Sequence, residues 1–179
     1  MKKNYLLLLL IFGLISCDYE NQNTTETNKS QIVRLAIIEP LSGPNALAGQ
    51  MLLEHLKYVV SLTNERNKKI TYEVVEFDNK GSPQDALIAL NNVIDMGIKF
   101  IIQGSGSHIG LALSDAIEKY NQRNLGFELI YLNSGAISDS LTNENCHFWH
   151  FRFDSSVSIK VNSLTSALSN VPKLNKLYL

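Results

Sequence analysis

The segment that decides the fold is Ile98–Ile117, IKFIIQGSGSHIGLALSDAI. Its first six residues, ending at Gln103, form a short apolar block next to glycine, which is typical of a strand buried on both faces. From Ile109 onward the apolar residues recur at helical spacing. Between the two lies Gly104–Ser107, a loop made only of glycine and serine. A strand, a small-residue loop and a helix build a ligand site at the carboxyl end of a parallel sheet, where free amides and hydroxyls can hold an anion.

The same alternation of strand and helix continues on both sides of this segment. Strands are predicted at residues 32–38, 70–77, 98–103 and 127–133, with a segment of one apolar and one polar face at 145–153. Helices are predicted from 46 to 67, from Ser82 as a cap to Gly97, from 109, and after Asp154 or Ser155. The ending Lys176–Leu179 predicts the start of one more strand. This order predicts an α/β fold with a doubly wound parallel sheet and helices on both faces.

The apolar stripes of the helices predict which residues face the sheet. For the first helix these are Leu52, Leu53, Leu56, Val59 and Val60. For the second they are Ala86, Leu87, Leu90, Val93 and Ile94, for the third Ala112, Leu113, Ala116, Ile117 and Tyr120, and for the last Val157, Val161, Leu164 and Leu168.

Composition limits the number of domains and the possible partners. The chain has 179 residues, of which 45% are hydrophobic, and a formal net charge of -1. This length allows about one domain with a real core. The balanced charge gives no sign of a nucleic-acid-binding surface.

The N-terminus has the pattern of an export signal. Lys2 and Lys3 precede an apolar run at 5–14 that is too short to span a membrane comfortably. The run ends in Leu14-Ile15-Ser16-Cys17, which resembles a bacterial lipobox, and this resemblance implies cleavage before Cys17 and a lipid on its sulfur. The expected organisation is therefore a lipoprotein signal at 1–16, a polar flexible tether at 17–31 and a folded lobe at 32–179.

The sequence is similar to two enzyme motifs but does not satisfy either of them. Gly104-Ser105-Gly106 with Gly110 is similar to a dinucleotide-binding turn, but it follows the third strand, and the next strand ends in Asn133 where a ribose-binding acid is needed. A hydrolase elbow needs Gly-x-Ser-x-Gly, and neither Ser105 nor Ser107 has that spacing.

Other reactive side chains favour structural roles. His147 and His150, on a predicted strand, should point to opposite faces and cannot share a metal. Cys146 is interpreted as a half-buried strand cysteine, and Asp78 as a turn-forming acid. No catalytic constellation, metal site or cofactor site is therefore expected, and the chain is predicted not to be an enzyme.

Several pieces in a fixed order carry a family resemblance. They are Glu39-Pro40-Leu41-Ser42-Gly43-Pro44, Asp78 with Pro83–Leu87, Gly104–Ser107 before Ser114-Asp115, Ser134-Gly135-Ala136 with Leu141-Thr142, and Phe151-Arg152. Taken together, Ile32–Leu179 resembles the N-terminal lobe of type I periplasmic solute-binding proteins, the leucine/isoleucine/valine-binding branch that serves ABC importers. Such proteins have two lobes that close on a ligand by a hinge, so the chain is expected to be the first lobe only.

The resemblance also implies a ligand site. The loop at Ser107 would grip a ligand carboxylate, and the loop at Gly135, Ala136 and Ile137 would offer a carbonyl and a threonine hydroxyl to the ligand ammonium. Ile137 departs from this pattern because it has no hydroxyl, which argues against a standard α-amino acid. A disulfide found in several relatives is absent, since both of its places are glycine, Gly81 and Gly106. The expected ligand-binding residues are Leu41, Ser42, Ser105, Ser107, Gly135, Ala136 and Ile137.

The resulting hypothesis is an exported solute-binding protein of the cell envelope, anchored through a lipid on Cys17 to the periplasmic or extracellular face of a membrane. It would deliver a small polar solute, amino-acid-like or related, to an ABC permease. Two alternatives stay open. One is a lipoprotein that senses a ligand and signals to a membrane partner, and the other is an exported enzyme of flavodoxin-like architecture.

Overall fold

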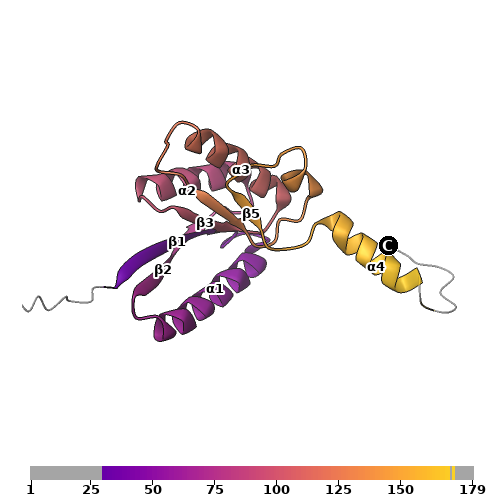
Figure 1. Cartoon of the computed structure of the whole chain (residues 1–179), viewed down its shortest axis with the longest axis horizontal. Coiled ribbons are helices and arrows are strands. Elements are labelled where there is room, and N and C mark those ends of the chain that lie inside the picture. Colours follow the sequence, from indigo (N-terminus) through magenta and orange to yellow (C-terminus); the bar gives the residue numbers. More distant parts are fainter. Residues whose placement is uncertain (1–29, 170, 172–179) are drawn as a thin grey trace, which may run out of the picture.

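A five-stranded, fully parallel sheet forms the centre of the protein (Figure 1). A computed structural model describes residues 30–169 and 171. The strand order is β2-β1-β3-β4-β5. The strands are β1 (Gln31–Glu39), β2 (Ile70–Asp78), β3 (Phe100–Gln103), β4 (Ile130–Asn133) and β5 (His150–Arg152).

Helices cover both faces of this sheet, as the alternating pattern predicted (Figure 1). One face carries α1 (Ala46–Arg66), which packs mainly on β2 and β1, and the other carries α2 (Pro83–Asp95) and α3 (Ser107–Asn121) side by side. A short 3-10 helix, η1 (Asp139–Thr142), precedes β5, and α4 (Val157–Ser169) follows it. The predicted α/β fold class, a doubly wound parallel sheet, is confirmed.

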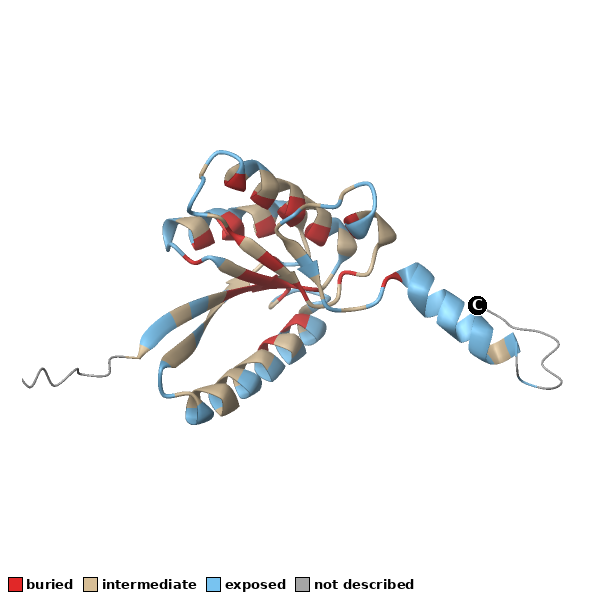
Figure 2. Cartoon of the chain, viewed as in Figure 1, coloured by how far each residue is buried: buried red, intermediate tan, exposed pale blue. Residues whose placement is uncertain are grey.

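The main core lies between the sheet and the pair α2 and α3 (Figure 2). Ala36 and Ile38 of β1, Ile101 of β3 and Tyr131 of β4 are fully buried there. The helices contribute Ala86, Leu90, Val93, Leu113 and Ile117, all members of the predicted stripes. Local signals at the ends of α2 also hold, because the Ser82 side chain accepts a hydrogen bond from Asp85 N and Gly97 has φ 65°.

Two predicted strands begin later than the sequence pattern suggested. The third strand starts at Phe100 and the fourth at Ile130, while Phe127 lies in the preceding turn and is 67% exposed. Ile98 and Leu129 are nevertheless buried in the core, so these apolar residues pack before the paired part of each strand begins.

The predicted stripe of α1 is partly wrong, and the predicted stripe of α4 is wrong. Val59 of α1 is 55% exposed, because α1 is a surface helix whose only buried residues are Gly49 and Leu53. In α4 no residue is buried, and the helix projects away from the sheet (Figure 2). The base of α4 is nevertheless fixed, since Val157 N donates to Ile137 O at 3.0 Å and Ser158 Oγ donates to Asp139 Oδ2 at 2.7 Å.

The described residues contain no helix that is long and apolar enough to cross a membrane. The predicted signal at 1–16, nearly all of the tether and the strand at Lys176–Leu179 lie outside the described residues. They stay predictions.

Candidate functional site

The carboxyl ends of the five strands bring the predicted ligand loops to one edge of the sheet, called the carboxyl edge here. Gly104 packs directly on the next loop: a Cβ there would lie 2.7 Å from Gly135 N and would meet Ser134 Oγ. Ser138 N donates to Ser107 Oγ at 3.1 Å. The loop after β3 and the loop after β4 are therefore in contact along their length, as the parallel sheet required.

Glu39, the last residue of β1, is the central residue of this edge, and sequence reasoning did not single it out. Its side chain is fully buried. Gly104 N donates to Oε1 at 2.6 Å, and Ser105 N donates to Oε2 at 3.2 Å. Burial raises the pKa of Glu39, and hydrogen bonds from the Ser105 side chain and the two amides only partly oppose this rise.

This arrangement corrects the expectation of free loop amides for Gly104 and Ser105, though not for Ser107. The amides of Gly104 and Ser105 already bind a carboxylate of the protein itself. A second negative group at the same amides would meet the charge of Glu39. The signal that could have revealed this residue is an acid at the end of the apolar run 35–38, because an acid that continues a buried strand needs partners inside the fold.

Asp78, the last residue of β2, performs the same task for the loop after β1. Its Oδ1 accepts hydrogen bonds from Leu41 N at 2.9 Å, Ser42 N at 3.3 Å and Lys80 N at 2.8 Å. Burial acts to raise the pKa of Asp78, but hydrogen bonds from the Ser42 side chain and these amides outweigh it and lower the pKa. The interpretation of Asp78 as a turn-forming acid is confirmed, and the amides of Leu41 and Ser42 are occupied by it.

Gln103, the last residue of β3, fixes the loop that follows its own strand. Its side chain is fully buried, accepts a hydrogen bond from Tyr131 Oη at 2.5 Å and donates to Ser105 O at 2.7 Å. Burial raises the pKa of Tyr131, with the charge of Glu39 adding to the effect. Tyr131 therefore stays a neutral donor, and Ser105 is held from both its amide and its carbonyl.

Ser107 does not cap α3. Gly106, with φ 91°, takes the N-cap position, and no side chain caps the helix. The Ser107 hydroxyl accepts the amide of Ser138 instead, so it links two loops. It can still donate its own proton to a ligand. The amides of Ser107 and His108 open the helix and have no partner among the described residues, so they face the edge as free donors.

Asn133 organises the loop that contains Gly135, Ala136 and Ile137. Its Oδ1 accepts the amides of Gly135 at 3.1 Å and Ala136 at 2.7 Å, and its Nδ2 donates to Ala136 O at 2.9 Å. Ile137 O accepts Val157 N. The carbonyls of Ala136 and Ile137 are thus already used within the lobe, while Ser134 Oγ is buried and has no partner in the described residues.

Arg152 of β5 completes the edge. Its guanidinium donates to Ser138 O at 2.9 Å and to Thr142 Oγ1 at 3.0 Å. Next to it on the same face, the His150 ring stacks on Tyr131 at a centroid distance of 4.8 Å, and burial lowers the pKa of His150. The polar face of β5 is therefore the packed one, whereas Phe151 and Phe153 are 47% and 74% exposed.

Two interpretations of single residues need correction. His147 lies before β5, outside the strand, and its Nε2 is 2.8 Å from Asp115 Oδ1 of α3. Cys146 is exposed in the same connection and is not a half-buried strand residue. Both errors have one cause: the segment was predicted over 145–153, whereas β5 has only three residues and begins at His150. Among the described residues, no cluster of His, Cys, Asp and Glu is arranged to hold a metal ion.

Comparison with known proteins gives one family. The family model described as "Periplasmic binding protein" matches residues 32–179. The Leu/Ile/Val-binding protein homolog 4 of Brucella abortus is 34% identical over 142 residues, which are 77% of this chain and 34% of that protein. This chain therefore spans about a third of the length of that relative.

Solved structures agree with this result. A leucine-, isoleucine-, valine-, threonine- and alanine-binding protein from Brucella ovis, in a closed conformation, superimposes with a TM-score of 0.67 at 36% identity, over 73% of this chain and 34% of that one. A periplasmic binding protein from Burkholderia mallei, at 23% identity and TM-score 0.65 over 78% of this chain and 36% of that one, shows the fold alone. The parallel sheet, the edge built from its loops and the family match over 148 of 179 residues lead to one conclusion: this chain belongs to the periplasmic binding protein family.

Proposed function

We propose that this chain is the first lobe of an exported, lipid-anchored solute-binding protein that presents a small polar solute to an ABC importer. The observation that carries the proposal is the carboxyl edge, where the loops after β1, β3 and β4 are locked together by Glu39, Asp78, Ser107 and Asn133. Pre-organised loops at the carboxyl ends of parallel strands are the usual ligand position in such sheets.

The relatives supply the solute class to be tested. Their names give leucine, isoleucine, valine, threonine and alanine as ligands of one relative. In this lobe the groups left for a ligand include the Ser107 hydroxyl and the amides of Ser107 and His108 at the start of α3. These are donors, and a helix start favours a negative group, so a carboxylate or another anionic or polar group is the expected partner.

The test is a titration of isotopically labelled protein followed by amide chemical shifts. L-leucine, L-threonine and L-alanine are added in turn, together with acetate as a probe of the carboxylate alone. Weak binding is expected because a single lobe offers one wall of a two-lobed site. The shift changes should be confined to the carboxyl edge around Ser107, His108 and Gly135. Changes elsewhere, or none with any of these solutes, would contradict the proposed site.

Ile137→Thr is the companion variant. If the edge descends from an amino-acid site, the added hydroxyl provides an acceptor for an ammonium and should strengthen binding of an α-amino acid several-fold, on the scale of one hydrogen bond. Acetate binding should not change. Equal affinity of both proteins for the amino acids would favour a solute of a different class.

A further inference from the structure

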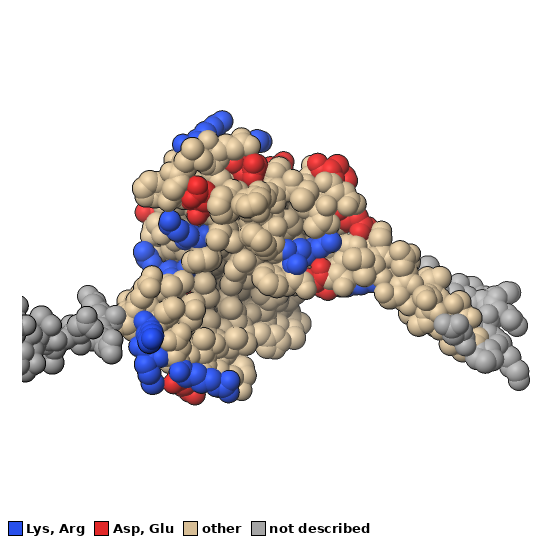
Figure 3. Space-filling view, in the orientation of Figure 1, with Lys and Arg blue, Asp and Glu red and all other residues tan. Residues whose placement is uncertain are grey.

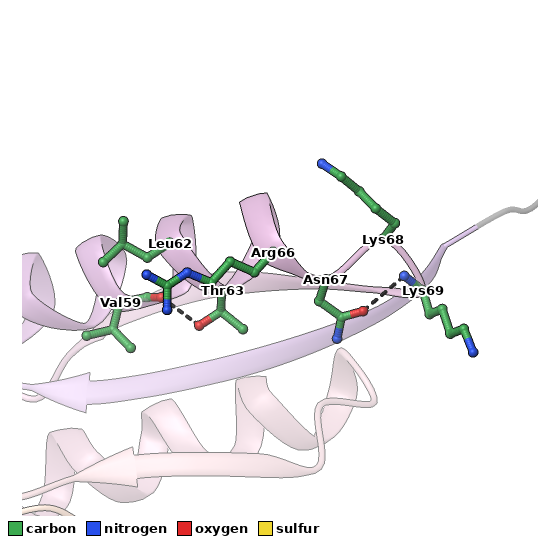
Figure 4. A pocket seen from close by; sticks show the side chains of 7 residues that line it. All are labelled: Val59, Leu62, Thr63, Arg66, Asn67, Lys68 and Lys69. Carbon is green, nitrogen blue, oxygen red and sulfur yellow. Dashed lines mark hydrogen bonds between the residues drawn. The ribbon is translucent and has the colours of Figure 1, made fainter.

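The end of the sheet opposite the carboxyl edge carries an open depression of about 700 Å³ (Figure 4). It lies between the last turns of α1 and the loop into β2. Its lining is Val59, Leu62, Thr63, Arg66, Asn67, Lys68 and Lys69. Val59 and the three cations are exposed. We name these seven residues the basic depression.

The cations of the basic depression are not neutralised by the lobe. In the part of the chain that the structure describes, Arg66, Lys68 and Lys69 form no ion pair with a carboxylate. The Lys68 and Lys69 side chains leave the loop in different directions, and Arg66 lies along α1 (Figure 4). Because these three charged groups point in different directions, they cannot all contact one small anion. They suit an extended anionic surface, which long side chains can reach while their stems cover apolar groups such as Val59.

The N-terminal segment enters the fold directly beside the basic depression. Gln31 N donates to Lys69 O at 2.9 Å, and Thr71 Oγ1 donates to Ser30 Oγ at 3.0 Å. Cys17 precedes Ser30 by 13 residues. Even fully extended, 13 residues span at most about 45 Å. A lipid on Cys17 would therefore hold the basic depression close to the membrane surface.

The two ends of the lobe also differ in charge (Figure 3). At the end with the basic depression, cations outnumber acids: Arg34, Arg66, Lys68, Lys69, Lys99 and Arg123 stand against Glu65, Glu73, Asp95 and Glu128. At the carboxyl edge, acids outnumber cations: Glu39, Asp78, Asp85, Asp139 and Asp154 stand against Lys80, Arg152 and Lys160. A negative surface therefore attracts the first end and repels the second.

We infer that the basic depression docks on the headgroups of anionic phospholipids and lays this end of the lobe on the membrane, with the carboxyl edge turned toward the solute. The inference rests on the proposed anchor at Cys17 for proximity and goes beyond it in assigning a surface and an orientation. Headgroup phosphates would meet Arg66, Lys68 and Lys69, and the apolar stems would lie over Val59 and Leu62.

The test measures orientation in the lipidated full chain. Cys146→Ser leaves no thiol other than the lipidated one, and Ser61→Cys then places a fluorophore beside the basic depression, while Gln84→Cys places it at the carboxyl edge. Vesicles contain phosphatidylcholine alone or mixed equally with phosphatidylglycerol, with a headgroup quencher in each. With phosphatidylglycerol, the label at residue 61 should be quenched and the label at residue 84 should not. Added salt should reverse this effect, because it screens surface charge.

Charge reversal gives the matched comparison. The triple variant Arg66→Glu, Lys68→Glu, Lys69→Glu should lower the docked-to-undocked ratio at least about a hundredfold, taking about fivefold for each lost cation. The double variant Lys80→Glu, Lys160→Glu at the carboxyl edge changes the net charge as much as Lys68→Glu, Lys69→Glu does, and it should keep the docking. Equal quenching in neutral and anionic vesicles, or no effect of the triple variant, would overturn the inference.

A rival occupant is the tether itself, which carries Asp18, Glu20 and Glu26. Quenching that appears only after these acids are changed to amides would show that the tether fills the basic depression, and would also overturn the inference. Failure of the anchor is detected separately, by the mass of the N-terminal peptide that contains Cys17.

Discussion

At the scale of single residues, the lobe uses buried carboxylates to organise backbone amides. Glu39 and Asp78 end adjacent strands, and between them they accept five loop amides. The two differ in their pKa: burial dominates at Glu39 and raises it, whereas hydrogen bonds dominate at Asp78 and lower it. Among the described residues no cation pairs with Glu39, so its charge is stabilised by amides and a hydroxyl alone.

Glu39→Gln tests this buried charge through pH. Because folding raises the pKa of Glu39, the folded state holds the proton more tightly, and stability is lost as pH rises from about 4.5 through the raised pKa. Glutamine does not titrate. The free energy of unfolding of the variant, minus that of the wild type, should therefore increase with pH across this window. The lowered pKa of His150 acts in the opposite direction in both proteins and cancels in the difference.

Urea unfolding at a series of pH values measures this difference. Glu39→Ala is the control for the hydrogen bonds, because it leaves the amides of Gly104 and Ser105 without an acceptor and should cost about 1–3 kcal/mol at every pH. A difference between glutamine and wild type that does not vary with pH would show that Glu39 is protonated throughout or reaches solvent.

Ser107→Ala and Ser134→Ala form a second comparison of single hydroxyls. Ser107 Oγ accepts the amide of Ser138, so its removal should destabilise the lobe by about 1 kcal/mol. Ser134 Oγ is buried and has no partner in the described part of the chain, so its removal should leave stability unchanged or raise it. Thermal melting of both variants checks the order. Equal losses would mean that the two hydroxyls are bonded alike. Under the proposed function, only Ser107→Ala should also weaken solute binding.

At the scale of elements, the carboxyl edge depends on how closely neighbouring loops approach. Gly104 touches Ser134 and Gly135 without space for a side chain. The absence of a side chain at residue 104 is part of how this segment shapes the fold, because a Cβ there would push the loops after β3 and β4 apart. The glycine at residue 104 therefore allows the two loops to pack closely. In a dinucleotide-binding turn, the glycines would instead let the backbone approach a phosphate.

Gly104→Ala should therefore destabilise the lobe by about 1–3 kcal/mol through overpacking. Part of that loss should be recovered in the double variant Gly104→Ala, Ser134→Ala, which removes one of the atoms that the new Cβ meets. The contact with Gly135 N remains in both, so recovery should be incomplete. Chemical denaturation of the four proteins measures the coupling. Fully additive effects would contradict direct contact between these loops.

α4 is the element with the least support from the rest of the fold. It buries no side chain, and a free helix of 13 residues is marginal in water. Its amides should exchange with solvent almost as fast as in an unfolded peptide, while the amides of α3, which packs on the core, should be protected. Amide hydrogen exchange read by mass spectrometry distinguishes the two helices. Equal protection of α4 and α3 would show that α4 has a partner surface in solution.

At the scale of the whole molecule, we assign different roles to the two ends of the lobe. The carboxyl edge holds the proposed solute site, and the basic depression lies beside the point where the N-terminal segment enters β1. A tethered protein whose site lies at the far end of its sheet from the tether can keep that site away from the membrane. This arrangement is consistent with an exported binding protein that must first meet its solute.

Cys17→Ser tests the anchor that this picture requires. Without the thiol at residue 17 the chain cannot take up diacylglycerol there, so wild type should incorporate labelled palmitate and the variant should not. The Cys146→Ser variant serves as the control, since it removes the other cysteine and should keep the label. Incorporation of label into Cys17→Ser, or none into the wild type, would contradict the lipoprotein hypothesis.

Local signals in the sequence predicted the order of strands and helices, the caps of α2, the buried stripes of α2 and α3 and the edge at which loops meet. These signals are apolar periodicity, small loop residues and the rule that parallel strands end together. Which polar groups at that edge are already occupied became clear from the fold alone. Glu39 accepts a hydrogen bond from the amide of Gly104, which is 65 residues away in sequence, and His147 contacts Asp115, which is 32 residues away. The fold also decided which face of β5 packs inward. Such pairings follow from how distant strands and helices align in the sheet, and no local pattern of residue types encodes that alignment.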